Sequence, residues 1–146
     1  MKKGARSGRH DTWLAKYIVP FSFTHRDIAA ALIRARRRGL DVQVIADRDQ
    51  TDAINSAAVR SLIDAGVPLF LDAEHAAAHN KVIIIDRSGA HPALVSGSFN
   101  FTFAAQERNA ENVLVLRGNP ELAQAYFHNW QTHREHAVAS VRNRAR

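Results

Sequence analysis

The stretch His79-Asn80-Lys81-Val82-Ile83-Ile84-Ile85-Asp86 decides the fold of this chain. Its middle, Val82 to Ile85, is apolar on both faces of an extended strand, which is typical of a central strand covered by helices on either side. Side chains alternate along a strand, so His79 and Lys81 point to the same side. The sequence therefore predicts an α/β fold with polar groups at the start of a buried strand.

The flanking segments alternate between helix and strand patterns. Thr24 opens a capping-box-like start of a helix that Gly39 ends, a second helix is expected from Thr51 to Gly66, and a third begins at Asn119-Pro120. The expected strands cover residues 40–46, 67–71, 94–96 and 113–116. This order predicts a mixed β-sheet sandwiched between helices.

Composition sets further limits. With 146 residues, 46% hydrophobic and 23% charged, the chain has the make-up of one ordinary globular domain. Its net charge of +6 fits polyanionic partners, either nucleic acid or acidic lipid headgroups, and equally a solubilising surface charge. The chain has no cysteine, which excludes disulfides, thiolate metal sites and thiol catalysis.

A second polar pair follows the central strand. Ser98 and Asn100 are again two residues apart and point to one side of the next extended segment. Together with His79 and Lys81 they offer a hydroxyl, a carboxamide, an imidazole and an ammonium to one phosphate. This set of groups suits phosphodiester chemistry without a metal or any other cofactor.

The pattern H-x-K-x-x-x-x-D followed by G-S-x-N is far more specific than a lone H-x-K. HNKVIIID, GSFNF and NAENVLVL resemble the phospholipase D superfamily, and residues 17–130 resemble its small single-motif bacterial members, the Nuc-type endonucleases. The resemblance implies a phospholipase D-like fold. Nuc-type relatives usually carry an additional strand and helix before the segment matching Tyr17 to Thr24, so we expect this chain to lack that first strand and helix.

The resemblance also implies a covalent two-step displacement and assigns roles to residues. His79 would be the nucleophile, Lys81 and Asn100 would hold the non-bridging oxygens, and Ser98 would add one more hydrogen bond. Glu111 sits where family members place a carboxylate that orients an imidazole.

Asp86 belongs to the motif, but its odd offset of seven residues from His79 puts it on the other face or beyond the strand end. We expect it to support the site by bonding backbone or partner groups.

The implied mechanism needs two histidines, and the motif occurs once in the chain. One of two adjacent imidazoles, with an unperturbed pKa near ~6.5, can be neutral while the other carries the proton. A twofold homodimer would bring two copies of His79 together. The expected activity is that of a hydrolase, a metal-independent endonuclease acting on DNA or also RNA.

Two alternatives remain open. The substrate could be a phospholipid of the cardiolipin type, or the chain could be a non-catalytic nucleic-acid-binding module on the same scaffold. No amphipathic membrane-binding helix is apparent, which favours nucleic acid. The longest strongly apolar run, residues 82–85, is far below the ~20 residues that cross a bilayer, so no stable membrane insertion is expected.

The expected domain limits are a disordered basic arm over residues 1–11, a phospholipase D-like catalytic domain over residues 12–139, and a basic tail over residues 140–146. Lys2 and Lys3 precede a polar segment instead of the apolar core of an export signal. A cytoplasmic location is the default, and periplasmic export remains open if the N-terminus is truncated.

Other side chains receive plainer interpretations. His75 and His79 are spaced like two zinc ligands, but we expect His75 to be an exposed loop residue and no metal to bind. Solvation is likewise favoured over metal binding for three histidines of the last helix, His128, His133 and His136. The aromatic rings Phe99, Phe101 and Phe103 are expected to pack into the core.

Overall fold

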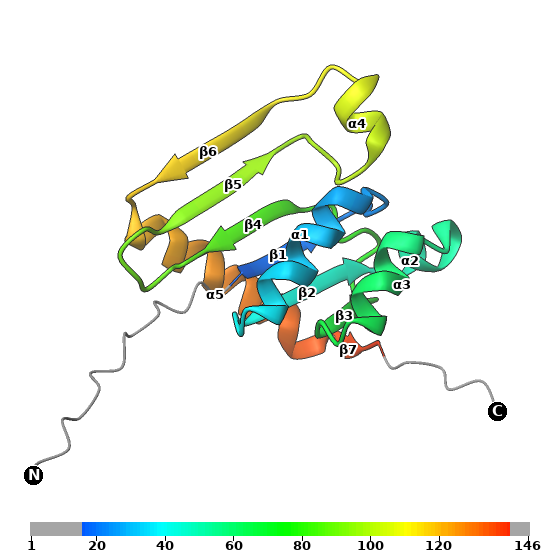
Figure 1. Ribbon diagram of the computed structural model, residues 1–146, viewed down its shortest axis with the longest axis horizontal. Helices are drawn as coiled ribbons and strands as arrows, with labels where there is room; N and C mark the ends of the chain where they lie inside the picture. The colour runs from blue at the N-terminus through cyan, green and yellow to red at the C-terminus, as the bar shows by residue number, and fades with distance from the viewer. Residues whose placement is uncertain (1–15, 141–146) are drawn as a thin grey trace, which may run out of the picture.

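The structure, a computed structural model, describes residues 16–140 (Figure 1). The predicted basic arm lies outside the described residues, as does the predicted tail beyond Ser140. One seven-stranded sheet forms the centre, in the order β6-β5-β4-β1-β2-β3-β7. Its strands are β1 (Lys16–Pro20), β2 (Val42–Asp47), β3 (Leu69–Asp72), β4 (Lys81–Ile85), β5 (Ala93–Gly97), β6 (Val113–Arg117) and β7 (Val138–Ala139).

The directions of the strands bring distant segments to one end of the sheet. β1, β2 and β3 run parallel, and β4 is antiparallel to β1, with Pro20 paired to Lys81. β5 and β6 continue antiparallel, with Gly97 paired to Val113. The last residues of β1, β2, β3 and β5 therefore lie at the same end as the first residues of β4 and β6. We call this the site end of the sheet.

Helices cover both faces of the sheet, which confirms the predicted mixed sheet between helices. Helices α1 (Arg26–Arg37) and α3 (Ala57–Asp64) lie on one face, and α5 (Pro120–His136) crosses the other (Figure 1). β4 is buried as predicted: Ile83 packs toward the core of α1 and α3, and Ile84 toward the core of α5. Each face of β4 thus contributes to a separate core.

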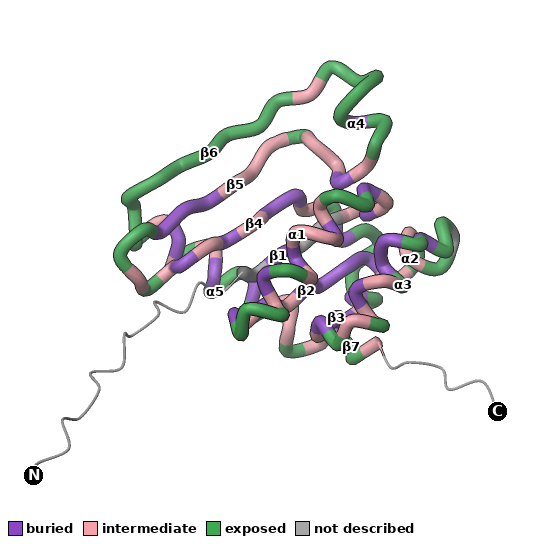
Figure 2. Tube along the Cα trace, viewed as in Figure 1, coloured by how far each residue is buried: buried purple, intermediate pink, exposed green. Residues whose placement is uncertain are grey.

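β6 is uncovered. Figure 2 shows this edge strand exposed along its whole length, and its apolar side chains Val113, Leu114, Val115 and Leu116 are 41–59% exposed. Phe103, in the short helix α4 (Phe103–Glu107), is 58% exposed, so its predicted packing into the core is wrong. Phe101 is buried and Phe99 packs against the same core, as predicted.

The predicted cap at Thr24 is wrong by one residue. His25 precedes α1 without a side-chain capping bond. The backbone N–H groups of Thr24 and His25 both donate to the carbonyl of Phe101, at 2.9 and 2.8 Å. This contact with a distant segment fixes the entry to the helix, and no local sequence pattern reports it. Gly39, with φ 86°, ends the helix as predicted.

The predicted single helix from Thr51 to Gly66 is two helices. Asp47 caps α2 (Arg48–Ile54) by accepting from Gln50 N at 2.8 Å, so the helix begins before Thr51. Asn55 then adopts a left-handed conformation with φ 46°. Ser56 caps α3 and donates to the carbonyl of Phe23 at 2.6 Å, a long-range bond that favours the break. None of the helices in residues 16–140 is long and apolar enough to cross a membrane.

Candidate active site

The resemblance assigns roles to six residues, here called the motif residues: His79, Lys81, Asp86, Ser98, Asn100 and Glu111. All except Asp86 lie at the site end of the sheet. His79 and Lys81 stand at the start of β4, Ser98 and Asn100 follow the end of β5, and Glu111 precedes the start of β6. β5 lies between β4 and β6, with Val82 opposite Ser96 and Gly97 opposite Val113. The pairing of these strands makes one polar surface from three separate segments of the chain.

The imidazole of His79 is exposed and rests on the ring of Phe21. The ring centroids are 4.4 Å apart and the planes meet at 65°, an edge-to-face contact. The N–H of Phe21 donates to the carbonyl of Asn80 at 2.9 Å, which ties the end of β1 to the histidine segment. The imidazole is therefore held on one side and open to solvent on the other.

Lys81 is the buried cation of the site, with 7% of its surface exposed. Its Nζ donates to the carbonyl of His79 at 3.1 Å and lies 5.0 Å from the centre of the Phe21 ring. Burial lowers the pKa of Lys81 below its ordinary value of 10.5, because desolvation penalises the ammonium, while the negative charge of Glu111 acts in the opposite direction.

Glu111 is held by polar neighbours. Ser98 Oγ donates to Glu111 Oε2, and Asn109 Nδ2 donates to Glu111 Oε1 at 3.0 Å. Ser98 Oγ in turn accepts from the N–H of Asn112 at 3.0 Å. The hydrogen bonds from Ser98 and Asn109, and to a lesser extent the charge of Lys81, lower the pKa of Glu111. The carboxylate is therefore ionised near Lys81, and its contacts in the described structure are to Ser98 and Asn109 and not to the imidazole of His79.

Asn100 is partly buried beside these groups. Its Oδ1 is buried without a hydrogen-bond partner among residues 16–140. Burying an unpaired polar atom costs free energy, and such atoms in native folds often have a functional explanation.

Asp86 is separated from the other five residues. It directly follows β4 at the opposite end of the strand, with φ 51°. Its Oδ2 accepts from the N–H of His91 at 2.8 Å, and its carbonyl accepts from Gly89 N at 3.0 Å. The residue stabilises the turn into β5. Its supporting role in the site stays a prediction.

Sequence reasoning missed several neighbours. Phe21, Asn109 and Asn112 each contact a motif residue. The polar run around Glu111 gave a signal for the two asparagines, whereas Phe21 has no local signal because only strand pairing brings it to His79.

The interpretation of His133 and His136 as solvated is wrong. Both contact the buried carboxylate of Asp72, as does His75, which is exposed in its loop as expected. The packing of α5 against β3 creates this cluster. His128 is exposed, as predicted.

Comparison with known proteins places the chain in a family. The model of the family described as "Cardiolipin synthase, PLD-like domain" matches residues 7–133. The chain belongs to this phospholipase D-like family.

Relatives by sequence include enzymes named for lipid chemistry. The chain is 40% identical over 114 residues to "Phospholipase D" of Rickettsia felis, covering 78% of this chain and 54% of that protein. It is 31% identical over 107 residues to "Mitochondrial cardiolipin hydrolase" of Danio rerio, covering 73% and 44%. The chain therefore spans about half the length of these relatives.

Solved structures agree with the fold. The phospholipase D family member Nuc from Salmonella typhimurium superposes with a TM-score of 0.80 at 30% identity, covering 90% of this chain and 85% of the other. NucT from Helicobacter pylori superposes with a TM-score of 0.72 at 28% identity, covering 86% and 82%. The phospholipase D-like fold expected from the motifs is confirmed.

Proposed function

We propose that residues 12–139 form a metal-independent phosphodiesterase that cleaves nucleic acid as a homodimer through a covalent phosphohistidine. The observation that supports it most directly is the open imidazole of His79, whose backbone carbonyl is bonded to the buried ammonium of Lys81. An accessible nucleophile and a fixed cation beside it are two of the groups that displacement at phosphorus uses, and a general acid is the third.

In the proposed first step, a ring nitrogen of His79 attacks phosphorus and the bond to the leaving oxygen breaks. A second imidazole, in its protonated form, gives its proton to that oxygen. In the second step the now neutral imidazole takes a proton from water, the water oxygen attacks phosphorus, and the phosphorus–nitrogen bond breaks. Lys81 and Asn100 stabilise the charge on the non-bridging oxygens in both steps, so the mechanism requires no metal.

The second imidazole would come from another copy of the chain. An isologous dimer axis beside His79 brings two copies of this residue face to face. β6 supports association, because it starts two residues after Glu111 and exposes four large apolar side chains as an uncovered sheet edge. A second copy seated near this edge would remove apolar surface from water close to the site.

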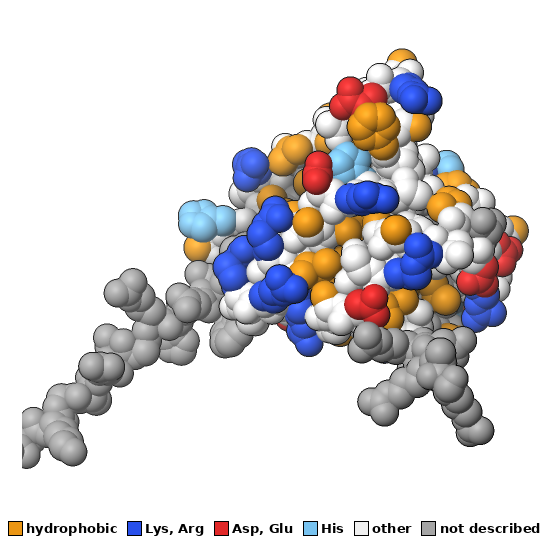
Figure 3. Space-filling view, turned by 45° about the vertical axis from the view of Figure 1, so that its right-hand side comes forward, with side chains coloured by type: hydrophobic (Ala, Val, Ile, Leu, Met, Phe, Trp, Pro, Cys, Tyr) orange, Lys and Arg blue, Asp and Glu red, His pale blue; other side chains and the backbone are white. Residues whose placement is uncertain are grey.

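Nucleic acid is the favoured substrate because of charge and fold. Figure 3 shows Lys and Arg side chains spread over one face of the molecule with acidic side chains at several places among them, and the chain as a whole carries a net charge of +6. The region that matches this chain makes up most of the structural neighbours Nuc and NucT, 85% and 82% of their chains. Gripping phosphate instead of bases would give low sequence specificity.

A phospholipid of the cardiolipin type is the second candidate, favoured by the names of the relatives from Rickettsia felis and Danio rerio. Both substrates carry a phosphodiester, and the site residues would treat them alike. A binding module without turnover would keep the affinity for phosphate and lose the covalent step.

Trapping of a phosphohistidine tests the enzyme directly. A labelled oligonucleotide and labelled cardiolipin vesicles are each mixed with the wild type, with His79→Ala and with the control His128→Ala, whose histidine is exposed on α5. We expect label on the wild type and the control with the oligonucleotide and none on His79→Ala, in the presence of EDTA. Label from the vesicles alone would favour the lipid substrate, and none from either would reject the covalent mechanism.

Mixed dimers test the shared site. Wild-type chains are unfolded and refolded with an excess of His79→Ala chains, so that most wild-type subunits enter heterodimers. Since each site would then lack one imidazole, activity per wild-type subunit should fall toward zero. The same mixture with His128→Ala chains should keep full activity. Undiminished activity with His79→Ala would rule out a shared site.

A further inference from the structure

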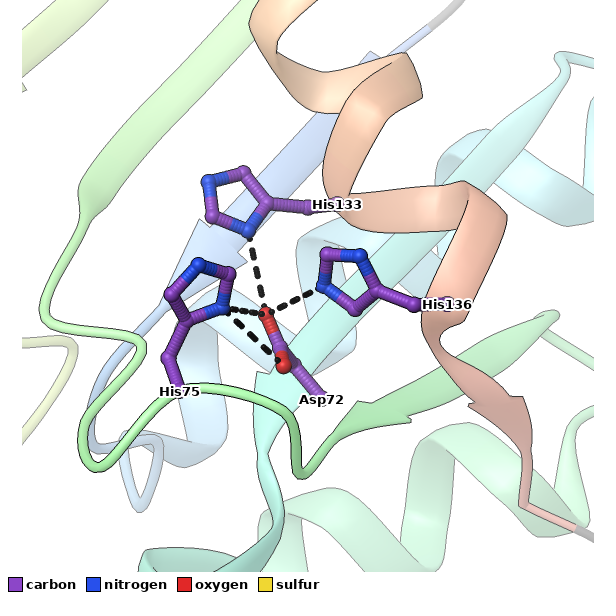
Figure 4. Close-up of side chains that lie close together, drawn as sticks. All are labelled: Asp72, His75, His133 and His136. Carbon is purple, nitrogen blue, oxygen red and sulfur yellow. Dashed lines mark hydrogen bonds and ion pairs between the residues drawn. The ribbon is translucent and has the colours of Figure 1, made fainter.

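Three histidines surround one buried carboxylate, and none of the four is among the residues assigned to the active site (Figure 4). Asp72, the last residue of β3, is 1% exposed. Its Oδ2 lies 3.2 Å from His75 Nδ1, 3.0 Å from His133 Nδ1 and 3.2 Å from His136 Nε2. The two α5 histidines have side chains only 12% and 21% exposed. All four ligand atoms lie within 4.8 Å of one another.

Ordinary hydrogen bonding explains this arrangement poorly. One carboxylate oxygen has two lone pairs, and here three imidazole nitrogens approach the same oxygen. The other oxygen, Oδ1, accepts from the N–H of Glu74 at 3.0 Å and lies 3.4 Å from His75 Nδ1, so His75 is shared between the two oxygens. Three imidazoles whose ring centres are 5.0–5.7 Å apart would also repel one another if each carried a proton charge. A single cation bound by all four side chains would explain both why the three imidazoles converge on one carboxylate and how they lie close together without each carrying a proton charge.

We propose that Asp72, His75, His133 and His136 bind one divalent transition-metal ion, with Zn²⁺ as the ion that this donor set fits best. Three imidazole nitrogens and one carboxylate oxygen form a four-coordinate set that Zn²⁺ accepts, whereas Mg²⁺ and Ca²⁺ prefer oxygen ligands. A tetrahedral ion with bonds of ~2.0–2.1 Å holds its ligand atoms about 3.3–3.4 Å apart. The three distances from Asp72 are within a few tenths of an ångström of that spacing.

The outer contacts suit metal ligands. A metal-bound histidine usually donates its other ring N–H to a carboxylate or another oxygen acceptor, which fixes the tautomer. His136 points Nε2 at the cluster and holds Nδ1 3.0 Å from Glu74 Oε2. His133 points Nδ1 at the cluster, and its Nε2 lies 3.5 Å from Asn80 Nδ2. A flip of this carboxamide, which exchanges its nitrogen and oxygen, would turn an oxygen acceptor toward His133.

The ion would cross-link three segments of the chain near the proposed active site. It would join the end of β3 and the loop over residues 73–80 to the last turn of α5, a segment that is distant in sequence. The loop contains His79, and His133 Nε2 lies 3.5 Å from Nδ2 of Asn80, the next residue. The ligands do not include the motif residues, so the ion would hold the loop in place without entering the chemistry.

Metal titration of the full chain, made without a histidine tag, tests the proposal. The protein is stripped with EDTA, exchanged into metal-free buffer and titrated with ZnCl₂ by calorimetry, and with CoCl₂ by visible absorption, which reports four-coordinate geometry. We expect one ion per chain and a higher melting temperature with Zn²⁺. His136→Ala and His133→Ala should bind at least ~10-fold more weakly, and Glu74→Gln should weaken binding ~10–100-fold. The control His128→Ala should bind as the wild type does.

Two outcomes would overturn the proposal: a folded wild-type chain that takes up no Zn²⁺ at micromolar concentrations, or equal binding by His136→Ala and His128→Ala. The wild-type titration needs no variant to fold, and circular dichroism checks that each variant is folded. Binding is measured without any substrate. Its result is therefore independent of the nuclease proposal, which predicts label transfer in EDTA for as long as the stripped chain remains folded.

Discussion

The Nζ of Lys81 donates a hydrogen bond of 3.1 Å to the backbone carbonyl of His79, so the buried cation of the site also fixes the chain that carries the exposed imidazole. Both residues stand at the start of β4, where the strand leaves the core. The rigid strand thus positions the lysine, and the lysine holds the less regular histidine segment. Removing the charge of Lys81 is therefore expected to lower the activity without lowering the free energy of unfolding.

Replacing Lys81 with Met should separate the two effects. We expect kcat for phosphodiester cleavage to fall about 10²–10³-fold, because a charged donor to the transition state is lost. The free energy of unfolding should stay constant or rise, because an apolar side chain fills the same space without the desolvation cost of a buried ammonium. Steady-state kinetics and urea denaturation measure the two quantities. A large loss of stability would show that Lys81 serves the fold.

The lowered pKa of Lys81 should affect cleavage at alkaline pH, below the pH at which an ordinary lysine loses its proton. Burial lowers the pKa of Lys81 below 10.5, and only its protonated form stabilises negative charge on the substrate. Deprotonation of Lys81 should therefore add a decline of activity as pH rises through the lowered pKa, beyond the decline that comes from losing the protonated imidazole. In Lys81→Arg, whose side chain stays charged, any remaining activity should persist to higher pH. A pH–rate profile of both proteins checks this, and identical alkaline limbs would contradict it.

The same shift has an opposite consequence for stability. Between the lowered pKa of folded Lys81 and 10.5, the unfolded chain binds more protons than the folded chain. The free energy of unfolding should therefore rise with pH across this interval, as far as Lys81 contributes. Urea denaturation at several alkaline pH values should show this contribution in the wild type and not in Lys81→Met.

The sequence predicts the central strand and the polar end of the sheet because both depend on local alternation. The apolar run from Val82 to Ile85 predicts burial on both faces, and the structure confirms it. The pairs His79/Lys81 and Ser98/Asn100 predict two polar strand ends, and the pairing of β4 with β5 brings them together. Alternation of side chains is a property of the backbone, so a short stretch of sequence suffices to read it.

Contacts between distant segments account for what the sequence does not predict. The break at Asn55 is accompanied by a hydrogen bond from Ser56 to Phe23, which precedes both α1 and β2 in the chain. The cluster at Asp72 forms only when the last turn of α5 packs beside the end of β3. The spacing of His133 and His136 places them on one side of a helix, but the acid that they meet is specified by tertiary packing.

Glu111→Gln should change the response of the protein to acid. Hydrogen bonds from Ser98 and Asn109 lower the pKa of Glu111 below its ordinary value of 4.5, so the folded chain favours the ionised form. This contribution to stability is present above pH 4.5 and is lost as pH falls through the lowered pKa. We therefore expect the wild type to lose stability more steeply than Glu111→Gln in this acidic range. Denaturant titrations at several pH values measure the slopes, and equal slopes would contradict the expectation.

Gly97→Ala should disrupt the site through the backbone. A Cβ at Gly97 would lie 2.2 Å from the carbonyl oxygen of Asn112, and the residue has φ 152°, which side chains rarely adopt. We expect a loss of about 3 kcal/mol or more in unfolding free energy and a loss of cleavage, since the segment of Glu111 and Asn112 must move away from Ser98. Gly66→Ala is the matched control: φ is 73° with no atom within 4 Å of a Cβ, so strain of about 1–2 kcal/mol is expected with full activity. Denaturation and kinetics compare the two variants. Equal activity in both would mean that the spacing of β5 and β6 does not set the geometry of the site.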